Sequence, residues 1–330
     1  RREPSGKGIN QMYASIAELV DVATSRSLTI GAAAREQEAL DSGQSQDALN
    51  SKMQERLAVM RDSVGRGLAG VRSRSGLTGG DARRMAEART HTRIIARTRT
   101  ADADGTAGGA PMPIGGEPLD SAIAYALAVA EVNAGMGRIV AAPTAGSCGV
   151  LPGVLFSVGE IRGAGDSELV DALFAAGGVG AVIARRSTLS GAAGGCQAEC
   201  GAAAAMAAAA AVQIAGGAPE QCANAVALAF KGLLGLVCDP VAGLVEVPCI
   251  KRNATSVAVA LAAADMALAG IRSVIPADEV IQAMGAIGRE LPASLRETAL
   301  GGLAVTPTGK RIVSEINATH DKAEEPHLNS

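Results

Sequence analysis

The stretch Gly235-Leu-Val-Cys-Asp-Pro-Val-Ala-Gly-Leu-Val-Glu-Val-Pro-Cys-Ile-Lys-Arg-Asn253 lies between Ala-rich apolar segments. Pro240 and Pro248 prevent a regular helix through it, because proline lacks the backbone N–H and clashes with the preceding turn. Irregular backbone in such an apolar chain has N–H and C=O groups that need hydrogen-bond partners. A long segment of this kind typically serves to bind a ligand, a metal or a cofactor. Cys238 and Cys249 indicate that it holds a metal or a metal cluster.

The composition around this stretch predicts an all-α fold. The chain has 330 residues, of which 48% are hydrophobic, yet it contains no Trp, two Tyr and three Phe. Ala and 41 glycines supply the small apolar surface instead. We therefore expect closely packed, Ala/Gly-rich helices whose Gly/Pro-rich junctions converge on one cluster site. The net charge of −3 argues against nucleic acid as a partner, since nucleic acid would need a basic face.

The order of the segments predicts one helical domain over residues 12–312, between a polar tail at 1–11 and a disordered tail at 313–330. Residues 99–117 are rich in Gly, Ala and Pro without any period, which predicts a flexible insert or lid. After the opening stretch, Ala254–Ala269 is expected to form a helix that is uncharged up to Asp265.

Gly201–Pro219 raises the question of a membrane, because it is uncharged and about as long as a membrane span. It is mostly Ala, which inserts into lipid less readily than Leu, so we expect a buried helix and no membrane partner. The polar residues 1–12 do not predict a signal peptide. Six cysteines without a secretory signal predict reduced thiols in the cytoplasm.

The three histidines lie outside the Gly-rich junctions, at His91, His320 and His327. A Ser-His-Asp or Cys-His catalytic pair within this chain is therefore not expected. A general base must be a Lys, Asp, Glu or Cys of this chain, or must come from another chain.

The cysteines allow a zinc site, an iron–sulfur cluster or simple packing. Three are interpreted as small buried residues that pack: Cys148, Cys200 and Cys222. Spacing alone gives weak support for a ligand trio of Cys196, Cys238 and Cys249. Thiolate ligation without histidine favours an iron–sulfur cluster over zinc.

Two further features suit an anionic ligand. The turn around Thr144 and Ser147 combines hydroxyls with small residues, which suits anion binding through backbone amides, although ordinary helix capping explains the same pattern. Lys251 follows a candidate ligand cysteine by two residues, where its charge would attract a substrate carboxylate. An ion pair between this basic segment and Glu246 is the alternative.

These motifs together resemble the alpha chain of the bacterial iron–sulfur-dependent L-serine dehydratases (L-serine ammonia-lyases) of the two-subunit type. The resemblance runs from about Ser15 to Lys310. Besides the opening stretch it is carried by Leu77-Thr-Gly-Gly-Asp-Ala82, Glu131-Val-Asn133, Pro143-Thr-Ala-Gly-Ser147, Ser190-Gly-Ala-Ala-Gly-Gly-Cys-Gln-Ala-Glu199, Ala264-Asp-Met-Ala-Leu-Ala-Gly270, Leu295-Arg-Glu-Thr298 and Gly301-Gly-Leu-Ala304.

The resemblance implies a [4Fe–4S] cluster held by Cys196, Cys238 and Cys249, with one iron open as a Lewis acid for the 3-hydroxyl of L-serine. Loss of the α-proton and of water would lead to pyruvate and ammonia without pyridoxal phosphate. The base that the family implies is a histidine in a Gly-Pro-Ser-Ser-Ser-His-Thr motif on a β-chain. This sequence lacks that motif, so we expect a β-subunit as partner.

Alternatives stay open at this stage. One is a related iron–sulfur lyase acting on L-cysteine or L-threonine, and another is a non-catalytic helical bundle with structural cysteines. The chain also departs from the family pattern. Residues 99–117 are longer than expected, and Ala184-Arg-Arg-Ser187 is more charged. The sequence ends in Leu-Asn-Ser, so capping of the open iron by a terminal cysteine, as in single-chain relatives, is not expected.

Overall fold

The computed structural model describes residues 13–98 and 113–324, and within these ranges it contains helices and turns but no β-strand. The all-α prediction is thus confirmed. The expected tail at 1–11 and most of the expected insert at 99–117 lie outside the described residues, so these predictions stay open.

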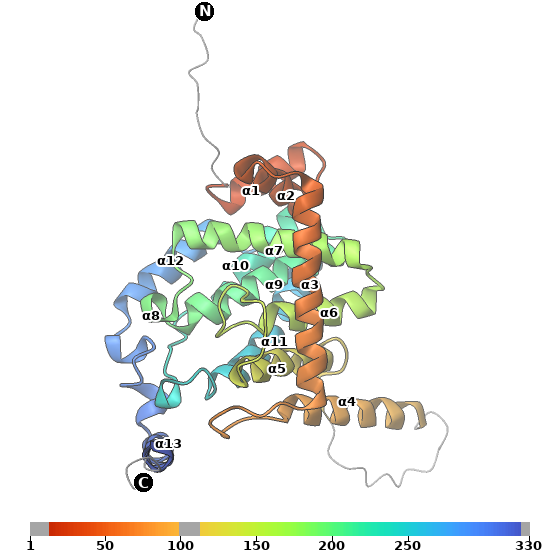
Figure 1. The fold of residues 1–330 in the computed structure, drawn as a ribbon. Helices are drawn as coiled ribbons and strands as arrows, with labels where there is room; N and C mark the ends of the chain where they lie inside the picture. The colour runs from red at the N-terminus through yellow and green to blue at the C-terminus, as the bar shows by residue number, and fades with distance from the viewer. Residues whose placement is uncertain (1–12, 99–112, 325–330) are drawn as a thin grey trace, which may run out of the picture.

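The α-helices follow one another along the chain as shown in Figure 1: α1 (Ile16–Ser25), α2 (Ile30–Ser42), α3 (Gln46–Ala69), α4 (Asp81–Thr98), α5 (Leu119–Ala134), α6 (Val150–Arg162), α7 (Asp166–Arg186), α8 (Gly191–Gly194), α9 (Ala202–Ile214), α10 (Pro219–Lys231), α11 (Cys249–Leu268), α12 (Ala277–Glu290) and α13 (Pro307–Glu324). Short irregular helices connect some of them: the π-turn η1 (Gln197–Gly201) and the 3-10 turns η2 (Val241–Gly243), η3 (Ala293–Leu295) and η4 (Gly302–Val305).

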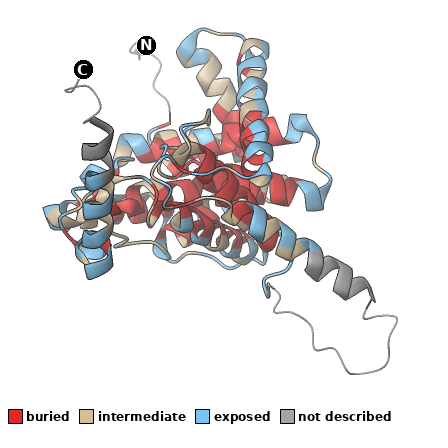
Figure 2. Ribbon diagram, turned by 60° about the horizontal axis from the view of Figure 1, so that its bottom comes forward, coloured by how far each residue is buried: buried red, intermediate tan, exposed pale blue. Residues whose placement is uncertain are grey.

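The poly-Ala helix α9 lies at the centre of the bundle and packs against α6, α7, α10 and α11. Every residue from Ala202 to Val212 is buried. Buried residues occupy the middle of the bundle in Figure 2, and exposed residues lie around them. The expectation of a buried helix in this stretch is confirmed. With 13 residues, α9 is also shorter than the roughly 20 residues that a membrane span requires.

Small residues let these helices approach closely. The long helix α3 runs along one side of the bundle in Figure 1 and crosses α5 at Gly67. A Cβ atom at Gly67 would lie only 2.3 Å from the carbonyl oxygen of Ala128. The Gly-rich composition is therefore used for close helix crossings as well as for turns.

One described helix, α7, is long and apolar enough to span a membrane by length and composition alone. Of its most apolar window, 61% is buried inside the protein, as in the core helix of a globular domain. The charges at its end make internal contacts: Arg186 donates to the carbonyl of Ala14 and pairs with Asp278 at 3.4 Å. They tie α7 to the start of α1 and to α12.

Two boundaries differ from the sequence predictions. Helix α11 begins at Cys249 and not at Ala254, because Pro248 precedes the first turn, where a missing N–H costs no helical hydrogen bond. The tail predicted to be disordered from 313 onward is helical as far as Glu324. The cause is tertiary packing: α13 rests on η2 and η4, and Ile312, Val313 and Ile316 are partly buried.

Candidate active site

Four cysteines from segments far apart in the sequence come together at the irregular junctions. Cys196 comes directly before the π-turn η1 and Cys200 lies within it, Cys238 precedes η2, and Cys249 is the first residue of α11. Cys196, Cys200 and Cys238 form one contact cluster of buried side chains, which also includes Leu236. Cys249 is 8% exposed and close enough to interact electrostatically with the other three. The structure thus brings together the trio chosen from the sequence and adds Cys200, for which the sequence favours a packing role.

Backbone and amide contacts fix the Cys238 segment. The Cys238 N–H donates to the carbonyl of Leu295 at 2.9 Å, and its carbonyl accepts from the Glu297 N–H at 2.8 Å. The buried Gln197 donates its backbone N–H to the carbonyl of Leu236 at 3.0 Å. Its side-chain oxygen accepts from the Gly235 N–H at 2.9 Å. The irregular stretch is therefore held in place by partners on both sides, one of which lies next to Cys196.

Asn253 joins the first turn of α11 to the turn that contains Thr144. Its side-chain nitrogen donates to the carbonyls of Gly146 and Cys249 at 2.7 and 2.9 Å, and its side-chain oxygen accepts from the Gly149 N–H at 2.9 Å. This buried amide uses both of its polar atoms, so it sets the position of the turn relative to Cys249.

The predicted hydroxyl residues reach the cysteine group through Glu199. Thr144 donates to Glu199 Oε1 at 2.7 Å, and the Thr144 and Ser147 hydroxyls lie 3.1 Å apart. Ser147 is fully buried. A Cβ at Gly191 would lie 2.6 Å from Glu199 Oε2 and 3.3 Å from Cys238 Sγ, so the free carboxylate oxygen and the thiol border the same small space.

Arg252 is the cation nearest to the thiols. It donates to the carbonyl of Val237 at 2.8 Å and pairs with Asp239 at 2.7 Å, with both side chains largely buried. A hydrogen bond from the Cys200 thiol, helped by the charge of Arg252, lowers the pKa of Cys196. Burial and the neighbouring Cys196 raise the pKa of Cys249 to about 12. Burial also raises the pKa of Glu199, although the Thr144 hydrogen bond opposes this.

Lys251 points elsewhere. Its ammonium forms an ion pair with Asp81, the first residue of α4. Glu246 accepts hydrogen bonds from Ser75 and Thr78 at 2.8 and 3.0 Å, and no ion pair joins it to Lys251. The side chain of Lys251 is 55% exposed, and its role toward substrate stays a prediction.

Sequence reasoning missed Glu199, Arg252 and Asn253 as site residues. For Glu199 a signal was present, because it is the only charged residue between Arg186 and Glu220. For the other two, the Lys-Arg-Asn triplet indicated that polar groups were needed but not which side chain points toward the thiols.

The chemistry of the donor set suits an iron–sulfur cluster. Over residues 13–98 and 113–324, no three or more His, Cys, Asp or Glu side chains are arranged to hold one metal ion. Buried thiols free of disulfides, with a cation beside them and no histidine ligand, suit such a cluster. Cys148 and Cys222 lie apart from this group, in the main core.

Comparison with known proteins agrees with these motifs. A family model described as serine dehydratase alpha chain matches residues 25–304. A probable L-serine dehydratase alpha chain of Bacillus subtilis is 46% identical over 305 residues, covering 92% of this chain and 95% of that protein. A probable L-serine dehydratase alpha chain of Latilactobacillus sakei is 55% identical over 195 residues, covering 59% of this chain and 93% of that protein. An L-serine dehydratase of Streptomyces coelicolor is 44% identical over 183 residues, covering 55% of this chain but 40% of that protein. This chain therefore belongs to the serine dehydratase alpha-chain family.

Proposed function

We propose that this chain is the α-subunit of an L-serine dehydratase, which converts L-serine into pyruvate and ammonia. Membership of the family makes the chain part of a lyase, so the alternative of a non-catalytic helical bundle is dropped. The observation that supports the mechanism best is the convergence of buried cysteines from separate motifs, beside a carboxylate and an arginine.

Cys196, Cys238 and Cys249 would hold the proposed [4Fe–4S] cluster. When bound, the cluster supplies a Lewis acid that makes the substrate hydroxyl a better leaving group. Arg252 would offset the negative charge of the thiolates, since its charge already acts on Cys196. The surrounding apolar residues would exclude water from the reacting groups.

Glu199 and Thr144 would orient the substrate. Thr144 fixes one carboxylate oxygen of Glu199 and leaves the other beside Cys238, where it would accept a hydrogen bond from the substrate α-ammonium. Ser147 is buried behind Thr144 and would hold its hydroxyl in place. Lys251 would meet the substrate carboxylate only by exchanging its ion pair with Asp81, the first residue of α4, for that carboxylate.

A mutation of Glu199 tests this arrangement. Glu199→Gln keeps the shape but removes the charge, and we expect it to raise KM for L-serine at least about tenfold while iron content is unchanged. Glu220→Gln, on an exposed carboxylate of α10, is the control. An unchanged KM in Glu199→Gln would contradict the role of Glu199.

The base would come from a β-subunit. The His-containing motif that the resemblance implies does not occur in this sequence, and none of its three histidines belongs to a Gly-rich junction of the sequence. The Streptomyces coelicolor relative is matched over 40% of its length, so most of that longer protein lies outside the similarity. Both observations support a second chain that completes the site.

The six free cysteines of this chain support the cytoplasm as the compartment of the enzyme.

Anaerobic purification tests the cluster. We expect a brown protein with about four irons per chain, and loss of that iron in Cys196→Ser, Cys238→Ser and Cys249→Ser. Cys148→Ser and Cys222→Ser are the matched controls and should keep it. Loss of iron in Cys200→Ser with retention in Cys249→Ser would overturn the ligand assignment, and an iron-free protein after anaerobic reconstitution would overturn the cluster itself.

Pyruvate formation from L-serine, measured with and without the cognate β-chain, tests the reaction and the partner. We expect turnover only when both chains are present. Full turnover by this chain alone would contradict the proposal that a β-subunit is required. The same assay with L-threonine and L-cysteine measures the specificity.

A further inference from the structure

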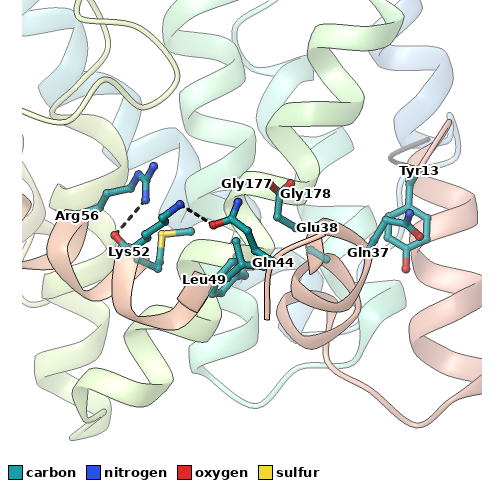
Figure 3. Close-up of a pocket in the computed structure, with 12 residues that line it drawn as sticks. Tyr13, Gln37, Glu38, Gln44, Leu49, Lys52, Arg56, Gly177 and Gly178 are labelled. Carbon is teal, nitrogen blue, oxygen red and sulfur yellow. Dashed lines mark hydrogen bonds between the residues drawn. The ribbon is translucent and has the colours of Figure 1, made fainter. Parts of the chain in front are cut away.

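A cavity lies between α2, α3 and α7 and is lined by none of the cysteine segments (Figure 3). Its volume is about 310 Å³, at the small end of the range for ligand pockets. None of the cysteines lines it, and none of its lining residues belongs to the cluster that Cys196, Cys200 and Cys238 form with Leu236. The cavity therefore requires an explanation of its own.

Gly177, an exposed glycine in the middle of α7, lines this cavity. A Cβ at Gly177 would meet no atom within 4 Å, so packing does not require glycine there. The adjacent Gly178 is different, because a Cβ there would lie 2.8 Å from the Cβ of Ala34. A glycine inside a helix costs about 1 kcal/mol relative to Ala. Gly177 thus carries this cost without a packing reason, and what it provides is empty space in the pocket.

Opposite charges lie at different places around the pocket. Figure 3 shows Lys52 and Arg56 of α3 toward one end and Glu38 of α2 closer to Tyr13. Lys52 donates to the side-chain oxygen of Gln44, and Arg56 donates to the backbone carbonyl of Lys52. Within the described part of the chain, no carboxylate pairs with either cation. The pocket therefore offers two cations to an anionic group and one carboxylate to a cationic group.

Beside these charges and the amides of Gln37 and Gln44, the wall contains apolar side chains. Leu49 and Phe174 are 6% exposed and Met53 is partly buried. Arg35 covers the ring of Phe174 at 5.6 Å, which helps to fix the ring. A ligand that fits this wall has an apolar group beside its charges.

We propose that this pocket binds an α-amino acid with an apolar side chain, at a site separate from the one that holds substrate. Its carboxylate contacts Lys52 and Arg56, its ammonium contacts Glu38, and its side chain packs on Leu49, Met53 and Phe174. Neither the iron–sulfur cluster nor the reaction is needed for this binding, so its failure is distinguishable from the failure of the proposed function.

Calorimetric titration of the full chain tests the ligand class, with L-leucine, L-methionine and L-phenylalanine as probes. We expect saturable binding of at least one of them at one site per chain. Its analogue without the ammonium and its analogue without the carboxylate should each bind at least about tenfold more weakly. Absence of binding for all three amino acids, or equal binding of the truncated analogues, would overturn the proposal.

A pocket-filling variant tests the location. Gly177→Leu places a side chain in the open space and should abolish binding while the helical circular dichroism is kept. Gly65→Leu is the matched control, because Gly65 is also a helical glycine at which a Cβ would meet no atom within 4 Å, and it lies on an exposed face of α3 away from the pocket. It should bind as the unmodified chain does. Undiminished binding by Gly177→Leu would place the amino acid elsewhere, including the substrate site, and refute the assignment.

Charge variants test the orientation. Lys52→Met should weaken binding of the amino acid at least about tenfold and leave the weak binding of the amine analogue unchanged. Glu38→Gln should weaken binding of the amino acid and leave that of the carboxylate analogue unchanged. If neither variant changes the affinity for the amino acid, the charges do not recognise it and the proposal is wrong.

Discussion

Asn253 is the single side chain on which the geometry near Cys249 most depends. It donates to two carbonyls and accepts one N–H, all in a buried environment. Asn253→Asp keeps the shape but turns a carboxylate oxygen toward the carbonyls of Gly146 and Cys249. We expect the free energy of unfolding to fall by about 3 kcal/mol, because buried acceptors lose their donors.

Urea denaturation of this variant measures the loss. Asn317→Asp is the control, since Asn317 is exposed on α13, and its effect should stay within about 0.5 kcal/mol. Equal stabilities of the two variants would mean that the Asn253 contacts do not hold the turn.

The two core cysteines should behave as unreactive thiols. Burial raises the pKa of Cys148 and of Cys222 to about 12. The thiolate fraction at neutral pH is then roughly a thousandfold below that of an exposed cysteine. Iodoacetamide should leave both unmodified in the folded chain and modify both in urea, as peptide mass spectrometry would detect. Rapid modification in the folded chain would contradict their burial.

Individual side chains also mark where the sequence stops being informative about the site. The cysteine trio was predicted as ligands from weak spacing support and from the resemblance, and the structure groups its members with Cys200. The sequence could not tell which of Lys251 and Arg252 lies beside the thiols, since consecutive helical residues point about 100° apart. Cys249 begins α11, so Lys251 and Arg252 reach different partners, Asp81 and Asp239.

Among the helices, close crossings make a prediction that separates two glycines of α3. At Gly67 a Cβ would lie 2.3 Å from Ala128 O, whereas at Gly65 it would meet nothing within 4 Å. Gly67→Ala should destabilise the protein by about 2 kcal/mol, because α3 and α5 must move apart. Gly65→Ala should stabilise it by about 0.5–1 kcal/mol through helix propensity. Thermal unfolding of both variants gives the comparison, and shifts of the same sign would show that the crossing is not tight.

Helix existence was predictable, but helix limits and special turns were not. The Ala/Gly composition and the spacing of apolar residues predicted the all-α fold class. The lack of charge in the poly-Ala segment predicted that its helix is buried. The start of α11 depended on the backbone around Pro248, and the helical state of 313–324 depends on packing against η2 and η4. The π-turn η1, which follows Cys196 and contains Cys200, has no local sequence signal; the Gln197 N–H at its start donates to the carbonyl of Leu236, a residue far along the chain.

In the molecule as a whole, the core and the cysteine group are built differently. The core consists of regular helices around α9, whose backbone hydrogen bonds are internal to each helix. The cysteine group consists of irregular segments that depend on long-range partners. Cys238 needs the 295–297 segment, and Asp239 accepts from the Leu303 N–H at 2.7 Å. The site is therefore expected to open at a lower free energy than the core.

Cluster removal should reveal this difference. Ligand bonds from Cys196, Cys238 and Cys249 would join three of these segments, and a group that binds only the folded form stabilises it. Removing it under oxygen or with a chelator should lower Tm. It should also increase amide hydrogen exchange over residues 190–201, 236–249 and 293–303. Exchange in α7 and α9 should hardly change, because their hydrogen bonds and burial do not involve the ligands.

Mass spectrometry of the loaded and stripped chain gives the measurement, with the Cys238→Ser variant, which is expected to lack iron, as control. A uniform increase that includes α9 would mean that the cluster supports the core itself, and no increase anywhere would mean that these cysteines do not hold it.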